Sequence, residues 1–296
     1  MALSCLYMSA CASPYESSES RRERSIEKAA TVLERTLDAD SLAAAALLRQ
    51  RDPARTLELL ARATQIAPDR PDLAWLHVQA CGRVPGCDSH AQVGRLRTLD
   101  PANGAAWLPA VAAAENADDE AMRLSALTAL ARTDHIDLYW TTFVVRLTRS
   151  VIATGELSSR DALTEMIGVL TVATIPAYRS VSQLCSGARL DDRASLQDCR
   201  AVALALERGD TDITEMEGAN IAQRLWPKDS PEWLAANAFR RVHEYRAAQL
   251  AHSTHSAFAD NRAADEFLDL CAHNHREQDV WIAELVADGK SPVPPT

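Results

Sequence analysis

The chain has few aromatic and glycine residues, and no stretch alternates apolar and polar side chains. Aromatic residues make up 5% of its 296 residues, and glycine occurs ten times. Half-buried strands need the alternation that is missing, and strands are usually enriched in aromatic and β-branched residues. Alanine, the best helix former, is abundant instead, and 47% of the residues are apolar. We therefore expect an all-α protein of closely packed helices.

The sequence also lacks a long apolar run and an excess of positive charge. A membrane-spanning helix needs roughly 18 apolar residues in succession, and no part of the chain offers them. The net charge is −10, so bulk electrostatics disfavours nucleic acids and anionic membrane surfaces as partners. We expect no nucleic-acid partner, and contact with a membrane only through an attached lipid.

Sequences typical of catalysis are missing as well. The chain contains no G-x-S-x-G, no phosphate-binding glycine loop and no G-x-G-x-x-G. We expect no catalytic residues and no cofactor. His252 and His255 share a helix face at a spacing that suits a metal ion, but no acidic residue completes a known ligand pattern. We interpret them as part of a solvated polar face; a metal-binding protein or an enzyme that uses the C-terminal histidines is an alternative.

The seven cysteines include two local pairs. Cys81 and Cys87 flank the turn "GRVPG", and Cys185 and Cys199 flank a second predicted turn between helices. Zinc sites typically use CxxC-type pairs, and redox pairs favour CxxC at a helix start, so neither pair matches these patterns. We predict disulfides Cys81–Cys87 and Cys185–Cys199, which stabilise the fold by about 2.4 and about 3 kcal/mol in the loop-entropy estimate. Cys271 is left over, and free thiols in a cytoplasmic protein are the alternative.

The chain begins with a short apolar segment, "MALSCLYMSAC", followed by a Ser-rich and charged stretch. The segment has the length of a signal-peptide core but lacks the basic residues that precede one. Its last four residues, "MSAC" at 8–11, resemble a bacterial lipobox, in which the cysteine becomes the lipidated first residue of the mature chain. The resemblance implies a lipid on Cys11 and a location on the periplasmic face of a bacterial membrane. A cytoplasmic location is the alternative.

Tryptophan recurs at a regular interval. Trp75, Trp107 and Trp140 are 32 and 33 residues apart, and each follows a helix-breaking turn: "APDRPDLAW", "LDPANGAAW" and "TDHIDLYW". Self-similarity at such a period is typical of helical-repeat proteins. We expect each tryptophan to pack in the core between neighbouring helix pairs.

The stretch "RDPARTLELLARATQIAPDRPDLAW" at 51–75 resembles the second helix of a tetratricopeptide repeat and the turn into the next repeat. Asp52 occupies the turn within the helix pair, Leu57, Leu60 and Ala63 form the inward stripe, and Pro68 ends the repeat. "LDPANGAAW" at 99–107 carries the same ending, and the resemblance covers residues 40–140. It implies antiparallel helix pairs that stack to complete a shared core.

The predicted fold is thus an all-α array of antiparallel helix pairs, an α-solenoid of tetratricopeptide-like repeats with an irregular helical C-terminal part. Residues 1–25 form a signal or lipid-anchor remnant and linker, 26–175 the repeats, 176–288 a continuous helical region, and 289–296 a flexible tail. Two long helices near 230–258 and 261–288 close the structure. Helix starts are predicted from Ser158 with Asp161, from Thr214 with Glu217, and from Ser230 before Pro231.

The resemblance implies a binding function rather than catalysis. The inner face of a curved helix stack offers an extended groove to a peptide or a protein partner. The first helices of the pairs would supply the groove residues, and His77, Gln79 and Tyr139 are our candidates. We expect a non-catalytic binding or scaffold protein of the bacterial cell envelope; a cytoplasmic helical-repeat adaptor is the alternative. The sequence specifies neither the partner nor the oligomeric state.

Overall fold

The computed structural model describes residues 18–176, 178–251 and 257–295. Within these ranges every regular element is a helix, and the only β-type pairing is one isolated bridge between Asn103 and His135. The all-α prediction is confirmed. The helices are α1 (Ser18–Glu34), α2 (Ala39–Leu48), α3 (Pro53–Ile66), α4 (Pro71–Cys81), α5 (His90–Leu99), the 3-10 helix η1 (Gly104–Trp107), α6 (Leu108–Ala117), α7 (Glu120–Ala131), α8 (Trp140–Ala153), α9 (Ser159–Thr174), α10 (Tyr178–Leu184), the 3-10 helix η2 (Gly187–Asp191), α11 (Arg193–Leu206), α12 (Asp212–Leu225), α13 (Pro231–Ala251), α14 (Asn261–His273) and α15 (Glu277–Ala287).

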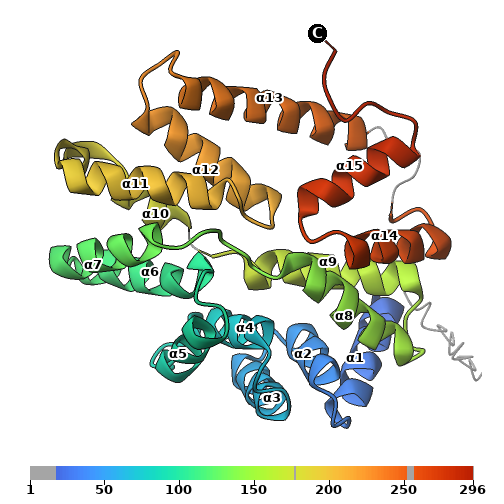
Figure 1. Cartoon of the computed structure of the whole chain (residues 1–296). Helices are drawn as coiled ribbons and strands as arrows, with labels where there is room; N and C mark the ends of the chain where they lie inside the picture. Colours follow the sequence, from blue (N-terminus) through green and yellow to red (C-terminus); the bar gives the residue numbers. More distant parts are fainter. Residues whose placement is uncertain (1–17, 177, 252–256, 296) are drawn as a thin grey trace, which may run out of the picture.

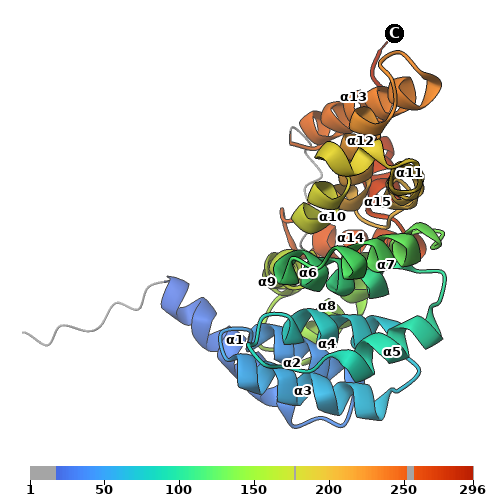
Figure 2. The ribbon, with the colours of Figure 1, turned by 90° about the vertical axis from the view of Figure 1, so that its left-hand side faces the viewer.

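The helices lie in three layers (Figures 1 and 2). Helices α1–α5 form the lowest layer in both views, α6–α9 the middle one, and α10–α15 the upper one, with α13 outermost. Consecutive helices pack together from α1 to α5. However, α8 and α9 return to pack against α2, and α14 then packs on α8 and α9. The middle layer is therefore covered on both sides by segments far apart in sequence.

Alanine allows this close packing at the centre. The run Ala43–Ala46 of α2 is fully buried on every side of the helix. A helix that is apolar all round must be surrounded by protein, and α2 contacts α1, α3, α8 and α9. Trp75 is also fully buried and Trp140 is 9% exposed, whereas Trp107 is half-buried beneath the guanidinium of Arg97.

Several helix ends are encoded locally. The Asp52 side chain accepts from the amide of Arg55 and Pro53 is the first residue of α3. Ser158 caps α9 and Ser230 precedes α13, as predicted. The predicted cap at Thr214 is wrong, because Thr211 caps α12 instead. The Thr214 hydroxyl lies in the core, 2.5 Å from the Tyr178 hydroxyl, a partner that local sequence does not reveal.

The predicted single helix over 261–288 is also wrong. It is divided into α14 and α15, and Asn274 between them is extended (φ −122°, ψ 129°). The break allows two residues to reach the loop before α12: the Arg276 side chain and the Glu277 amide donate to the carbonyls of Gly209 (3.2 Å) and Asp210 (2.8 Å). Tertiary hydrogen bonds therefore outweigh the helical propensity of this segment.

The structure joins both predicted cysteine pairs. Cys81 and Cys87 have an S–S distance of 2.03 Å and a Cα separation of 5.4 Å; for Cys185 and Cys199 the values are 2.08 and 5.5 Å. Cys81 is the last residue of α4, and the turn after it includes Gly86 at φ +76°, a conformation that favours glycine. The first bond thus closes the turn between α4 and α5.

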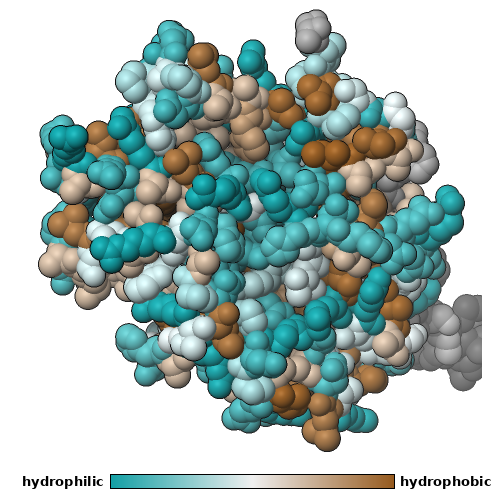
Figure 3. Space-filling model, in the orientation of Figure 1, coloured by the Kyte–Doolittle hydropathy of each residue, from teal (hydrophilic) through white to brown (hydrophobic). Residues whose placement is uncertain are grey.

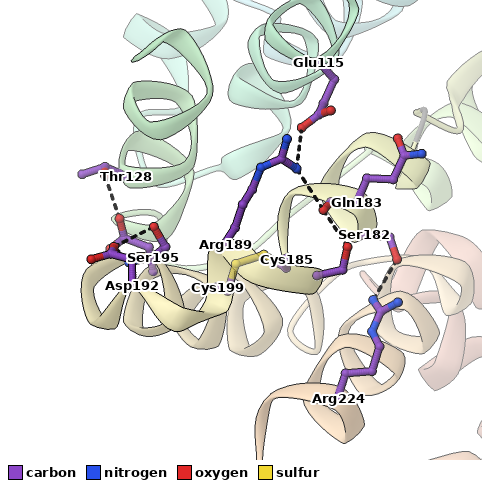
Figure 4. The surroundings of a disulfide bond; sticks show 12 residues. Glu115, Thr128, Ser182, Gln183, Cys185, Arg189, Asp192, Ser195, Cys199 and Arg224 are labelled. Atoms are coloured by element: carbon purple, nitrogen blue, oxygen red, sulfur yellow. Dashed lines mark hydrogen bonds and ion pairs between the residues drawn. A yellow bond between two sulfur atoms is a disulfide. The ribbon is translucent and has the colours of Figure 1, made fainter. Parts of the chain in front are cut away.

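The second disulfide holds the end of α10 against α11 (Figure 4). Arg189 of η2 donates to the carbonyl of Gln183 (3.3 Å) and pairs with Glu115 of α6 (3.4 Å). The bond and these contacts fix the irregular segment between the two helices onto the middle layer.

Candidate functional site

The residues predicted to line a groove are divided between core and surface. Tyr139 is 8% exposed; its hydroxyl donates to Asp100 (2.7 Å) and accepts from the Asn103 side-chain amide (3.0 Å). Contrary to the prediction, Tyr139 is a core residue and does not face a groove. His77 and Gln79 are half-buried on α4, where two residues of separation place them on different faces. Burial lowers the pKa of His77.

The other predicted sites fall on parts of the chain that are not described. Cys11, the predicted lipidation site, and His252 and His255, the alternative metal ligands, lie outside the described residues. Among the residues that are described, no group of three or more His, Cys, Asp or Glu side chains is arranged to hold a metal ion. No described helix is both long and apolar enough to cross a bilayer.

A buried polar junction connects the middle and upper layers. The Asp210 carboxyl accepts from the amides of Leu138 and Trp140, each at 2.8 Å. Burial, the neighbouring Asp137 charge and a hydrogen bond between the two carboxyl groups raise the pKa of Asp210 well above its usual range. Burial opposes ionisation of Asp137 too, but hydrogen bonds from His275 and Asp210 lower its pKa; His275 Nε2 lies 2.8 Å from its carboxylate.

The same junction anchors the start of α15. The Glu277 amide donates to the Asp210 carbonyl, and the Glu277 carboxylate accepts from the Asp212 amide (2.8 Å each). The Asp212 carboxylate in turn contacts His243 of α13 and accepts from the side chain of Gln278. Asp210 and Asp212 therefore fix α8, α13 and α15 relative to one another.

A pocket of about 250 Å³ lies beside this junction, between α8, α9 and the C-terminal helices. Aromatic and aliphatic side chains make up most of its described wall, which also includes three ionisable groups. We call it the C-terminal pocket; its described lining residues are Trp140, Ile167, Leu250, Ala257, Phe258, Phe267, Cys271, Glu277, Val280, Trp281 and Glu284. The junction positions two of them directly, because Asp210 holds both the Trp140 amide and the Glu277 amide.

The acids of the pocket are held in an environment that disfavours their charge. Burial raises the pKa of Glu277 to about 7, although its hydrogen bond from the Asp212 amide acts in the opposite direction. Burial alone raises the pKa of Glu284 to about 7. Burial, with the nearby Glu284 and Glu277, raises the pKa of the Cys271 thiol to about 12. The Cys271 thiol therefore stays protonated near neutral pH, whereas the two carboxyls change their charge in that range.

Some other hollows have a larger volume but a more polar lining. One of about 780 Å³ lies between α1, the α2–α3 turn and α9. Its charges are largely paired with one another, as Glu34 accepts from Arg49 (2.7 Å) and Arg55 (2.5 Å). Ligand sites are usually concave and apolar with a few polar groups, a description that fits the C-terminal pocket better than this hollow. Polar side chains cover most of the face seen in Figure 3, where apolar ones form only small groups, one of them over α15.

Comparison of the chain with family models, with curated proteins and with solved structures gave no significant match. The function must therefore be inferred from the residues themselves.

The pocket was not predicted from the sequence, although part of its pattern is present there. Glu277, Trp281 and Glu284 are spaced at i, i+4 and i+7, which places them on one face of a helix. Phe267 and Cys271 on α14 have the same i, i+4 relation. What the sequence does not show is that α8 and α9 supply the opposite wall.

Proposed function

We propose that the protein is a non-catalytic binding protein and that the C-terminal pocket receives an apolar group of a peptide or protein partner. The observation that carries this proposal is an apolar cavity with four aromatic side chains and few polar groups, positioned by a buried hydrogen-bonded junction. Preorganised cavities of this kind bind at little conformational cost. The partner would be held by shape and polar complementarity, without a covalent step.

The proposed location is the periplasmic face of a bacterial membrane, with a lipid on Cys11 as anchor. Two cysteine pairs at disulfide distance support an oxidising compartment, because disulfides are rare in reducing cytosol. The lipobox-like "MSAC" supports the anchor. We further propose that α2–α5 are a tetratricopeptide-like unit; the sequential packing of α2, α3, α4 and α5 and the turn at Asp52 support this.

A peptide selection tests the binding function. A random peptide library is selected on the purified wild-type protein alone, and the selected peptides are then measured on Ile167→Trp, in which the larger side chain fills the pocket. Val172→Trp is the matched control, because Val172 lies on the same helix, is 65% exposed and does not line the pocket. Circular dichroism and thermal unfolding verify that both variants are folded.

We expect peptides that bind the wild type and Val172→Trp equally and bind Ile167→Trp at least tenfold more weakly. Peptides that bind all three proteins equally would show that another surface is the binding site. Failure to select any peptide would contradict the proposed function.

A further inference from the structure

The ionisable groups among the described lining residues of the C-terminal pocket are all acidic. They are Cys271, Glu277 and Glu284, and no described lining residue is basic. Burial raises the pKa of Glu284, and no cationic group of the described residues acts on its ionisation. Glu277 has one backbone hydrogen-bond donor, the Asp212 amide, and the nearby Asp212 carboxylate adds repulsion. No basic side chain among the described lining residues therefore compensates these two partly buried carboxyls.

Aromatic rings are close to these carboxyls in sequence and space. Trp281 lies between Glu277 and Glu284 on the same face of α15, and Trp140, Phe258 and Phe267 also line the pocket. A cation is attracted to the face of an indole or phenyl ring, most strongly when it is desolvated. A carboxylate next to such rings adds a charge-assisted hydrogen bond. An anion, in contrast, would meet repulsion from both acids.

On the basis of the proposed function, we propose that the C-terminal pocket selects a protonated amine carried on an apolar stem, that is, an arylalkyl- or alkylammonium group. The ammonium neutralises the Glu284 carboxylate and lies against the tryptophan rings, while the stem fills the space near Ile167 and Phe267. On a peptide partner the same group is a basic side chain or an amino terminus next to an apolar residue.

The volume agrees with a ligand of this size. An apolar cavity of roughly 150 Å³ is large enough for benzene, and the C-terminal pocket measures about 250 Å³. The additional space accommodates a short stem and one ammonium group. A pocket this small also excludes a folded protein segment larger than one or two side chains.

Three probes of nearly equal size separate the charge from the apolar stem. They are 2-phenylethylammonium, 2-phenylethanol and phenylacetate, titrated at pH 8 and followed by ligand-detected NMR, which measures millimolar dissociation constants. The proteins are the full chain, Glu284→Gln, and the control Glu266→Gln. Glu266 lies on α14, is exposed and does not line the pocket, so its replacement removes the same charge elsewhere.

We expect the wild type and Glu266→Gln to bind the ammonium at least tenfold more tightly than the alcohol, and the carboxylate most weakly. In Glu284→Gln the preference for the ammonium should fall to about threefold or less, while binding of the alcohol is unchanged. Ile167→Trp should bind none of the probes.

Equal binding of the ammonium and the alcohol by the wild type would overturn the inference. It would leave the proposed function intact if the alcohol still fails to bind Ile167→Trp. Absence of ammonium binding would also overturn the inference, and the peptide selection then decides separately whether the pocket binds any partner. An ammonium preference that persists in Glu284→Gln would refute the assignment of the charge partner.

Discussion

Replacement of Glu284 by glutamine should stabilise the protein at alkaline pH and have little effect at acidic pH. Burial raises the pKa of Glu284 from 4.5 to about 7 in the folded state. The folded protein therefore binds a proton more tightly than the unfolded chain between these values. Stability attributable to this group decreases as the pH rises from 4.5 to 7, and the full cost is reached above that range.

The size of the effect follows from the pKa. The shift corresponds to about 3 kcal/mol when Glu284 is ionised and solvent screening is ignored. Because the side chain is half-buried and part of it is open to solvent, screening reduces the expected value to about 1–2 kcal/mol. Glutamine does not ionise, so Glu284→Gln removes this cost. Among the other ionisable groups, Cys271 on α14 faces Glu284 and remains protonated at pH 8.

Urea denaturation followed by circular dichroism at pH 5 and pH 8 measures the difference. We expect Glu284→Gln to raise the free energy of unfolding by about 1–2 kcal/mol at pH 8 and by less than about 0.5 kcal/mol at pH 5. The exposed control Glu266→Gln should change stability little at either pH. Equal effects at both pH values, or a loss of stability at pH 8, would refute the view that Glu284 is buried without a compensating charge.

Three further predictions concern the junction, the disulfides and the anchor. Asp210→Asn should lower the free energy of unfolding by about 1–3 kcal/mol, because one amide oxygen cannot accept from both Leu138 and Trp140; no loss in urea titration would show that water satisfies the second amide. Cys87→Ser should have a free energy of unfolding up to about 2.4 kcal/mol lower than that of the oxidised wild type and equal to that of the reduced wild type. An equal difference from the oxidised and the reduced wild type would mean that the bond does not form. Metabolic labelling with a fatty-acid analogue in bacteria should label the wild type and not Cys11→Ser; label on neither protein would exclude the anchor.

The features of the fold that could be predicted from the sequence are those that a few neighbouring residues determine, such as helix starts. Asp52 before Pro53, and Ser230 before Pro231, are sufficient to start α3 and α13, since a side-chain cap and a proline at the first turn act within a few residues. The break at Asn274 was missed because its cause is the loop at Gly209 and Asp210, more than sixty residues away in sequence. Hydrogen bonds between residues so far apart in the sequence cannot be predicted from the local sequence pattern.

The candidate site, too, could be predicted from the sequence only in part. The i, i+4, i+7 spacing of Glu277, Trp281 and Glu284 is visible in the sequence and defines one wall of the pocket. Its depth depends on Trp140 and Ile167, which are brought opposite by the return of α8 and α9. The prediction for Tyr139 failed for the same reason. The residue was assigned to a groove as part of the first helix of a pair, but it is buried by Asp100 and Asn103, partners that only the tertiary structure supplies.

The central claim is that the C-terminal pocket is the site at which this protein binds its partner. Isothermal titration of a selected peptide into the wild type, Val172→Trp and Ile167→Trp tests it most directly. The account predicts the same dissociation constant for the first two proteins and at least a tenfold larger one for Ile167→Trp. An unchanged dissociation constant in Ile167→Trp, with the variant shown to be folded, would contradict it.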